Sequence, residues 1–87
     1  MALHDEISNQ ILEKCINAIP SKNFTTLRGI DELIKSFPND TERIKSHSER
    51  NWRSVIGKAI KRFSVETNII KQISPASETP ARWEKMR

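Results

Sequence analysis

The chain has 87 residues, of which 36% are hydrophobic and 30% charged, and its formal net charge is +4. This length suffices for one small domain, and the single cysteine, Cys15, excludes an internal disulfide and a cysteine-based metal site. Residues 1–42 hold four Lys or Arg and seven Asp or Glu, whereas residues 43–87 hold eleven and four. This asymmetry predicts a polyanionic partner for the basic half, with nucleic acid as the first candidate.

The first part of the chain predicts a helix followed by a connector. Apolar residues recur at helical spacing and indicate a helix over about residues 3–18, which Pro20 ends. Cys15 lies on this apolar stripe, so we expect it to be a small buried hydrophobe. The segment "SKNF" that follows is a connector, with at most a single strand bridge at Phe24.

A second helix is expected over about residues 26–37. Thr25 or Thr26 can serve as its N-cap by accepting a hydrogen bond from a free backbone N–H, and Pro38 closes it. The stretch "DTERIKSHS" that follows is either a short helix capped by Asp40 or the early part of a third helix.

The third helix is expected over about residues 48–63, which contain the sequence "NWRSVIGKAIKRF". An apolar stripe at helical spacing predicts its buried face: Trp52, Val55, Ile56, Ala59, Ile60 and Phe63. At about 100° per residue, the opposite face carries Lys, Arg, Asn, Ser and Gly, without an acid after Glu49. This face is either an ordinary solvated surface or a binding surface, and the charge asymmetry favours binding.

Two short strands are expected after the third helix. The β-branched segment "NIIKQIS" predicts a strand at about 68–73, and "ARWEKM" predicts a second at about 81–86. Small and polar residues framed by two prolines form the loop 74–80 between them. Trp83 is expected to pack in the core of the fold rather than to stack on a nucleic-acid base.

The order of these elements resembles the winged helix-turn-helix family over nearly the whole chain. The resemblance rests on the basic third helix, on the strand "NIIKQI" that follows at once, and on the wing-like passage "SPASETPARWEKM". It implies a mainly α fold with a small C-terminal β-hairpin, that is, a three-helix winged helix-turn-helix in one domain over 1–87. The element order also resembles forkhead and linker-histone globular domains. One departure is the stretch 38–48, which is longer than the tight turn of the simplest members.

The resemblance implies double-stranded DNA as the partner, with the third helix in the major groove and the wing beside it. Outward residues at the N-terminal end of such a helix meet base edges, and cations further along meet phosphates. Gly57 either lets a DNA strand approach the helix or is a tolerated glycine. The candidate DNA-binding residues are Arg50, Asn51, Arg53, Ser54, Gly57, Lys58, Lys61, Lys71, Ser77, Thr79 and Arg82.

Other function classes are less favoured by the sequence. His4 and His47 have no other metal-ligating residue at the spacing that a metal site requires, and the sequence has no glycine-rich phosphate loop or nucleophile motif. We therefore expect that the protein is not an enzyme and has no catalytic residue, metal or cofactor. The alternative is a winged-helix module for protein–protein interaction without direct DNA contact. A DNA-binding domain this small is expected to act as a homodimer or as the DNA-recognising part of a larger protein, such as a regulator or a restriction-type nuclease.

Location is predicted from hydropathy. The sequence contains no membrane-spanning apolar run, and its polar, acidic N-terminus is unlike a signal peptide. We therefore expect no membrane partner and a cytoplasmic protein, nucleoid-associated if bacterial or phage and nuclear if eukaryotic.

Overall fold

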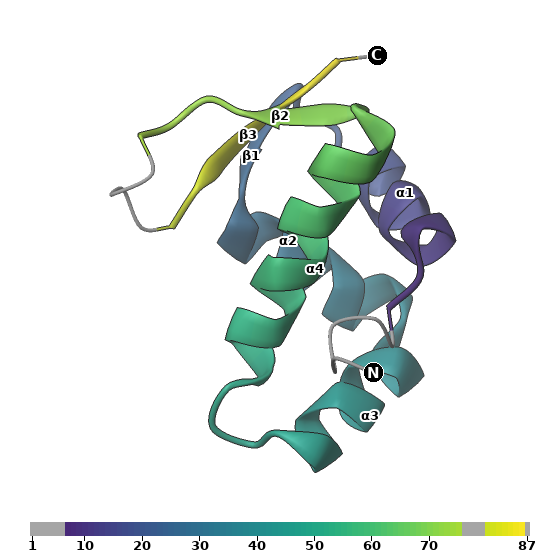
Figure 1. The fold of residues 1–87 in the computed structure, drawn as a ribbon. Helices are drawn as coiled ribbons and strands as arrows, with labels where there is room; N and C mark the ends of the chain where they lie inside the picture. The colour runs from purple at the N-terminus through teal and green to yellow at the C-terminus, as the bar shows by residue number, and fades with distance from the viewer. Residues whose placement is uncertain (1–6, 76–79, 87) are drawn as a thin grey trace.

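The fold is mainly helical with a small antiparallel sheet, seen in a computed structural model that describes residues 7–75 and 80–86. The elements follow one another as α1 (Asn9–Ala18), β1 (Asn23–Thr25), α2 (Thr26–Ser36), α3 (Pro38–His47), α4 (Trp52–Thr67), β2 (Ile70–Gln72) and β3 (Arg82–Lys85). The sheet lies at the C-terminal end of α4, and α3 lies near the N-terminal end of that helix (Figure 1).

The sheet has three strands, in the order β1-β3-β2, rather than the two of the expected hairpin. Phe24 of β1 is paired with Trp83 of β3, which is paired in turn with Gln72 of β2. The single bridge expected at Phe24 is therefore a full strand, because an aromatic and a threonine in "NFT" suit a half-buried edge beside β3. Strands β2 and β3 are shorter than the expected ranges 68–73 and 81–86.

Helix α1 begins later than the expected residue 3. Residues 3–6 lie outside the described residues, and the helix starts at Asn9 because Ser8 caps it, its Oγ accepting from the backbone N–H of Ile11 at 3.2 Å. Helix α2 begins at Thr26, and Thr25 is its N-cap, with Oγ1 accepting from the N–H of Arg28 at 3.2 Å. Both starts agree with the preference of hydroxyl side chains for the N-cap position.

The fold has four helices in its described part, and not the expected three. Of the two alternatives for residues 40–48, the separate short helix is correct, but it begins at Pro38 and has no side-chain cap from Asp40. Proline is well suited to the first helical position, because the N–H that it lacks would have no partner inside the helix.

The expected third helix corresponds to α4, and its predicted bounds of 48–63 are wrong at both ends. A turn in which the N–H of Asn51 donates to the carbonyl of Ser48 precedes the helix, so the helix starts only at Trp52. The helix then continues beyond Phe63 to Thr67. It ends at Asn68, which has the left-handed conformation with φ 56°, a conformation that asparagine tolerates better than most residues.

The core confirms the predicted stripe of α4. Ile56, Ala59, Ile60 and Phe63 are buried, while Trp52 and Val55 are partly buried and pack against the core. Trp83 is also a core residue, as predicted, and its Nε1 donates to Thr26 Oγ1 at 3.0 Å. The core therefore joins α4 to the sheet and fixes which face of the helix points to solvent.

Cys15 is buried in α1, which confirms that it is part of the core. Burial raises the pKa of its thiol to about 12, with smaller contributions from the carboxylates of Glu32 and Asp40. The thiol is consequently protonated at neutral pH and poorly reactive.

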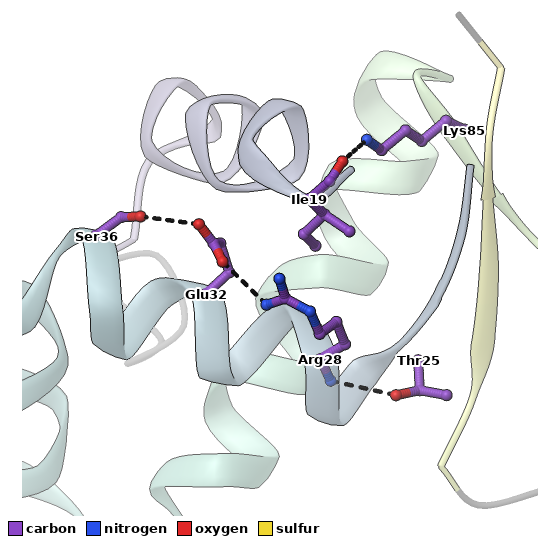
Figure 2. A network of polar contacts seen from close by, with 6 residues as sticks. All are labelled: Ile19, Thr25, Arg28, Glu32, Ser36 and Lys85. Atoms are coloured by element: carbon purple, nitrogen blue, oxygen red, sulfur yellow. Dashed lines mark hydrogen bonds and ion pairs between the residues drawn. The ribbon is translucent and has the colours of Figure 1, made fainter. Parts of the chain in front are cut away.

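A polar network fixes α2 and the end of α1 (Figure 2). The carboxylate of Glu32 is buried and accepts from Arg28 Nη1 at 2.9 Å and from Ser36 Oγ at 3.2 Å. The hydrogen bond from Arg28 is the main cause that lowers the pKa of this carboxyl below its ordinary value. In the same view, Lys85 Nζ donates to the carbonyl of Ile19, the C-cap residue of α1. This ammonium group therefore provides a hydrogen-bond donor for a carbonyl at the C-terminal end of the helix.

Candidate nucleic-acid interface

Helix α4 is the element that carries the densest group of cations. Its 16 residues, WRSVIGKAIKRFSVET, include four cationic side chains and one acid. At a rise of 1.5 Å per residue, the helix is about 24 Å long. Because the buried stripe holds one side against the core, most of its remaining side chains face solvent.

The acid of α4, Glu66, lies on the side of the helix that faces α1. Its Oε1 accepts from Asn9 Nδ2 at 2.9 Å, and Arg62 Nε lies 3.7 Å from the same oxygen. Arg62 also donates to the carbonyl of Ile7 at 2.5 Å. Arg62 and Glu66 therefore hold the start of α1 against α4, and Glu66, although exposed beside Lys58 and Lys61, is engaged by Asn9 and Arg62.

The exposed cations Arg50, Lys58 and Lys61 make no hydrogen bond or ion pair with other described residues. Several cations elsewhere in the fold are paired with a carboxylate. Such ion pairs join Arg28 to Glu32, Arg43 to Asp40, Lys45 to Glu42, Arg62 to Glu66 and Lys71 to Glu84. The outward face of α4 and the turn before it thus keep positive charge that the fold itself does not use.

Trp52, the first residue of α4, has two cations over its ring. Lys45 Nζ lies 4.6 Å and Arg53 Cζ 4.5 Å from the ring centroid. These cation–π contacts restrain the Arg53 guanidinium at the start of the helix, although Arg53 as a whole is exposed to solvent. A restrained, exposed guanidinium is suited to bidentate recognition of a phosphate or of a guanine edge.

The late start of α4 changes the placement of two candidate residues. Arg50 and Asn51 were expected on the outward face of the helix, but they lie in the turn that precedes it. Asn51 is the N-cap residue, and its side chain makes no capping hydrogen bond. The exposed side chains of the first helical turn are instead Arg53 and Ser54.

The helical spacing predicted that Gly57 points straight outward, but the structure places it differently. A Cβ at this residue would lie 3.6 Å from Cγ2 of Thr26, so Gly57 faces the first residue of α2 and is half-buried. A hollow of about 270 Å³ opens at this place, between α4, the start of α2 and the residues that precede β3. Its lining residues are Thr26, Leu27, Ile30, Arg53, Ser54, Gly57, Pro80 and Ala81.

The candidate residues of the expected wing and its flanking strands have different surroundings. Lys71 Nζ lies 3.7 Å from Glu84 Oε1 on the neighbouring strand, so its charge is partly compensated. Arg82 is exposed at the first position of β3, and its backbone N–H donates to Ser74 Oγ at 3.0 Å. Ser77 and Thr79 lie outside the described residues.

The arrangement separates the candidate residues into two groups. Arg53, Ser54, Lys58 and Lys61 share the exposed side of α4, whereas Lys71 and Arg82 lie on the sheet. Leu27 was not a candidate residue in the sequence, although it is 51% exposed beside the hollow. Pro80 and Ala81 were also missed, since nothing in the sequence indicates that they lie beside Gly57.

None of the protein-family models, curated proteins and solved structures compared with the chain matches it. Among the described residues, no helix combines the length and the apolar character needed to cross a membrane. In the same part of the chain, no group of three His, Cys, Asp or Glu side chains could hold a metal ion.

Proposed function

We propose that the protein binds double-stranded DNA through the exposed side of α4, as a domain of the winged helix-turn-helix type. The observation that carries this proposal is the group of cations at α4 that have no carboxylate partner among the described residues: Arg50, Arg53, Lys58 and Lys61. Unpaired cations on one exposed helix are the arrangement that releases counterions when DNA phosphates are bound.

The shape of the domain supports the same proposal. An α-helix fits the major groove of B-form DNA, and α4 exposes Arg53, Ser54, Lys58 and Lys61 to solvent. Sheet order β1-β3-β2, with β2 following α4 directly, supports the winged arrangement, in which the β2–β3 connection lies beside the duplex. On this proposal Arg53 and Ser54 approach base edges, whereas Lys58 and Lys61 approach phosphates.

A single domain of this size makes few phosphate contacts, so its affinity for DNA on its own is expected to be modest. Dimerisation, or attachment to a larger protein, would raise the effective affinity by placing two binding surfaces on one duplex. We therefore propose that the domain acts in one of these two forms.

A gel-shift comparison of duplex and single-stranded DNA at low salt tests the proposal. Duplex should bind more tightly, and Lys61→Ala should weaken binding to all duplex sequences alike, because a phosphate contact carries no sequence information. Lys14→Ala is the matched control, since Lys14 is an exposed lysine on α1 with no partner among the described side chains. Equal losses from both variants would show that α4 is not the binding surface.

One observation favours the alternative, a protein-interaction module. Val65 on α4 is 71% exposed and lines a hollow of about 350 Å³ together with Lys58, Lys61, Arg62 and Glu66. The surface that lines this hollow is mainly apolar, which suits contact with another protein. Failure of duplex DNA to bind at low salt would favour this alternative and overturn the proposal of DNA binding.

A further inference from the structure

Most of the residues that line the hollow beside Gly57 are apolar. The hydroxyl of Thr26 is engaged within the fold, because Oγ1 donates to the carbonyl of Ala81 at 3.4 Å and accepts from Trp83 Nε1 at 3.0 Å. The methyl group of Thr26 therefore faces Gly57. Leu27, Pro80 and Ala81 add further apolar surface, and Leu27 is 51% exposed although it belongs to the first turn of α2.

The rim of the hollow is polar and positive on the α4 side. Arg53 and Ser54 both line it, and Arg53 is restrained by its contact with Trp52. Lys58 and Lys61 lie on the same exposed side of the helix. A mainly apolar hollow with cations along one side is complementary to a polyanion that carries an apolar group.

A phosphate group suits this hollow poorly, because phosphate requires hydrogen-bond donors and, apart from Arg53 and Ser54, the side chains that line the hollow are apolar or bonded elsewhere. The apolar group that duplex DNA displays in its major groove is the C5 methyl of a pyrimidine. Contact between this methyl and small apolar side chains is an established form of base recognition.

We propose that the hollow formed by Thr26, Leu27, Gly57, Pro80 and Ala81 receives the C5 methyl group of a pyrimidine in duplex DNA. This inference rests on the DNA binding proposed above. The methyl belongs either to thymine or to 5-methylcytosine, which present the same group at the same position of the base. The absence of a side chain at Gly57 leaves the space that the methyl occupies.

The first experiment compares DNA that differs by one methyl group. A preferred duplex is selected from a random pool, and each thymine is replaced in turn by deoxyuridine. One position should lose about fourfold in affinity, the effect of removing one buried methyl group. In a second arm, cytosine and 5-methylcytosine, each paired with guanine, are compared at that position, and the methylated base should bind about fourfold more tightly than cytosine. A methyl effect at thymine alone would assign the site to thymine.

The second experiment tests whether Leu27 forms the wall of the methyl site. Leu27→Ala should reduce the difference between thymine and deoxyuridine duplexes to less than about twofold, while affinity for the deoxyuridine duplex stays near that of the unchanged protein. Met86→Ala is the matched control, because Met86 is 52% exposed and lies beyond the end of β3. This variant should keep the fourfold difference.

The outcomes separate this inference from the proposal on which it rests. If duplex DNA binds but no thymine position discriminates against deoxyuridine, the methyl site is refuted and DNA binding stands. If Leu27→Ala weakens binding to both duplexes equally, the hollow contacts DNA without recognising the methyl, and the inference is again wrong. If no duplex binds at all, both proposals fail.

Discussion

Gly57→Ala is expected to stabilise the protein. Glycine in the interior of a helix costs about 1 kcal/mol relative to alanine, so the substitution recovers about this amount if the new methyl group fits. The added Cβ would lie 3.6 Å from Thr26 Cγ2, which is an ordinary van der Waals distance, and no glycine of the described chain has a positive φ. The fold therefore offers both the space and the backbone conformation that alanine needs.

The expected gain can be measured as a melting temperature. For a domain of this size, 1 kcal/mol corresponds to an increase of about 4–8 °C. Thermal unfolding followed by circular dichroism at neutral pH, for the unchanged protein and the variant at equal concentration, measures this shift. The gain should also appear as a higher midpoint in urea with an unchanged slope.

Gly29→Ala is the matched control for this prediction, because Gly29 is also inside a helix. Its added Cβ would lie only 3.1 Å from Ile60 Cδ1, inside the core, so a buried neighbour must move. We expect Gly29→Ala to melt below Gly57→Ala. A decrease on Gly57→Ala, or an equal gain from both variants, would refute the packing described for the side of α4 that faces α2.

Three further substitutions test the core, the buried carboxylate and the end of α4. Phe63→Ala should cost about 3–5 kcal/mol, because Phe63 is fully buried, and urea unfolding should show a loss close to the stability of a small domain. In the folded state, the pKa of Glu32 lies below its ordinary value of 4.5, so the ionised carboxylate stabilises the fold above about that pH. This contribution to stability is lost as the pH falls further. The difference in melting temperature between Glu32→Gln and the unchanged protein should therefore shrink below about pH 4.5. Asn68→Gly should keep the stability of the left-handed C-cap, whereas Asn68→Ala should lose about 1 kcal/mol in the same unfolding assay.

The buried face of α4 could be predicted from the sequence, because the spacing of its apolar residues is a local property. Its ends could not be predicted in the same way. The start depends on the turn between Ser48 and Asn51, and the end depends on the left-handed conformation of Asn68. Neither feature has a distinctive apolar pattern, so the predicted helix was displaced toward the N-terminus.

The pairing of the strands and the hollow beside Gly57 could not be predicted from the sequence. Phe24 pairs with Trp83, and Thr26 bonds to Ala81, so residues far apart in the chain become neighbours. Each partner has an unremarkable local pattern, and only the packing of α2 on α4 turns one side of Gly57 toward Thr26. The cationic face was predictable by its charge, but the apolar hollow beside it required the fold.

The salt dependence of duplex binding tests the central proposal most directly. Binding constants are measured between low and physiological salt for the unchanged protein and for the double variant Lys58→Ala/Lys61→Ala. With roughly four to six phosphates neutralised, the logarithm of the binding constant should fall against the logarithm of salt with a slope of about −4 to −5. The double variant should reduce the magnitude of this slope by about 2, one for each lysine. An unchanged slope, or no duplex binding at low salt, would contradict the proposal that the exposed cations of α4 bind DNA.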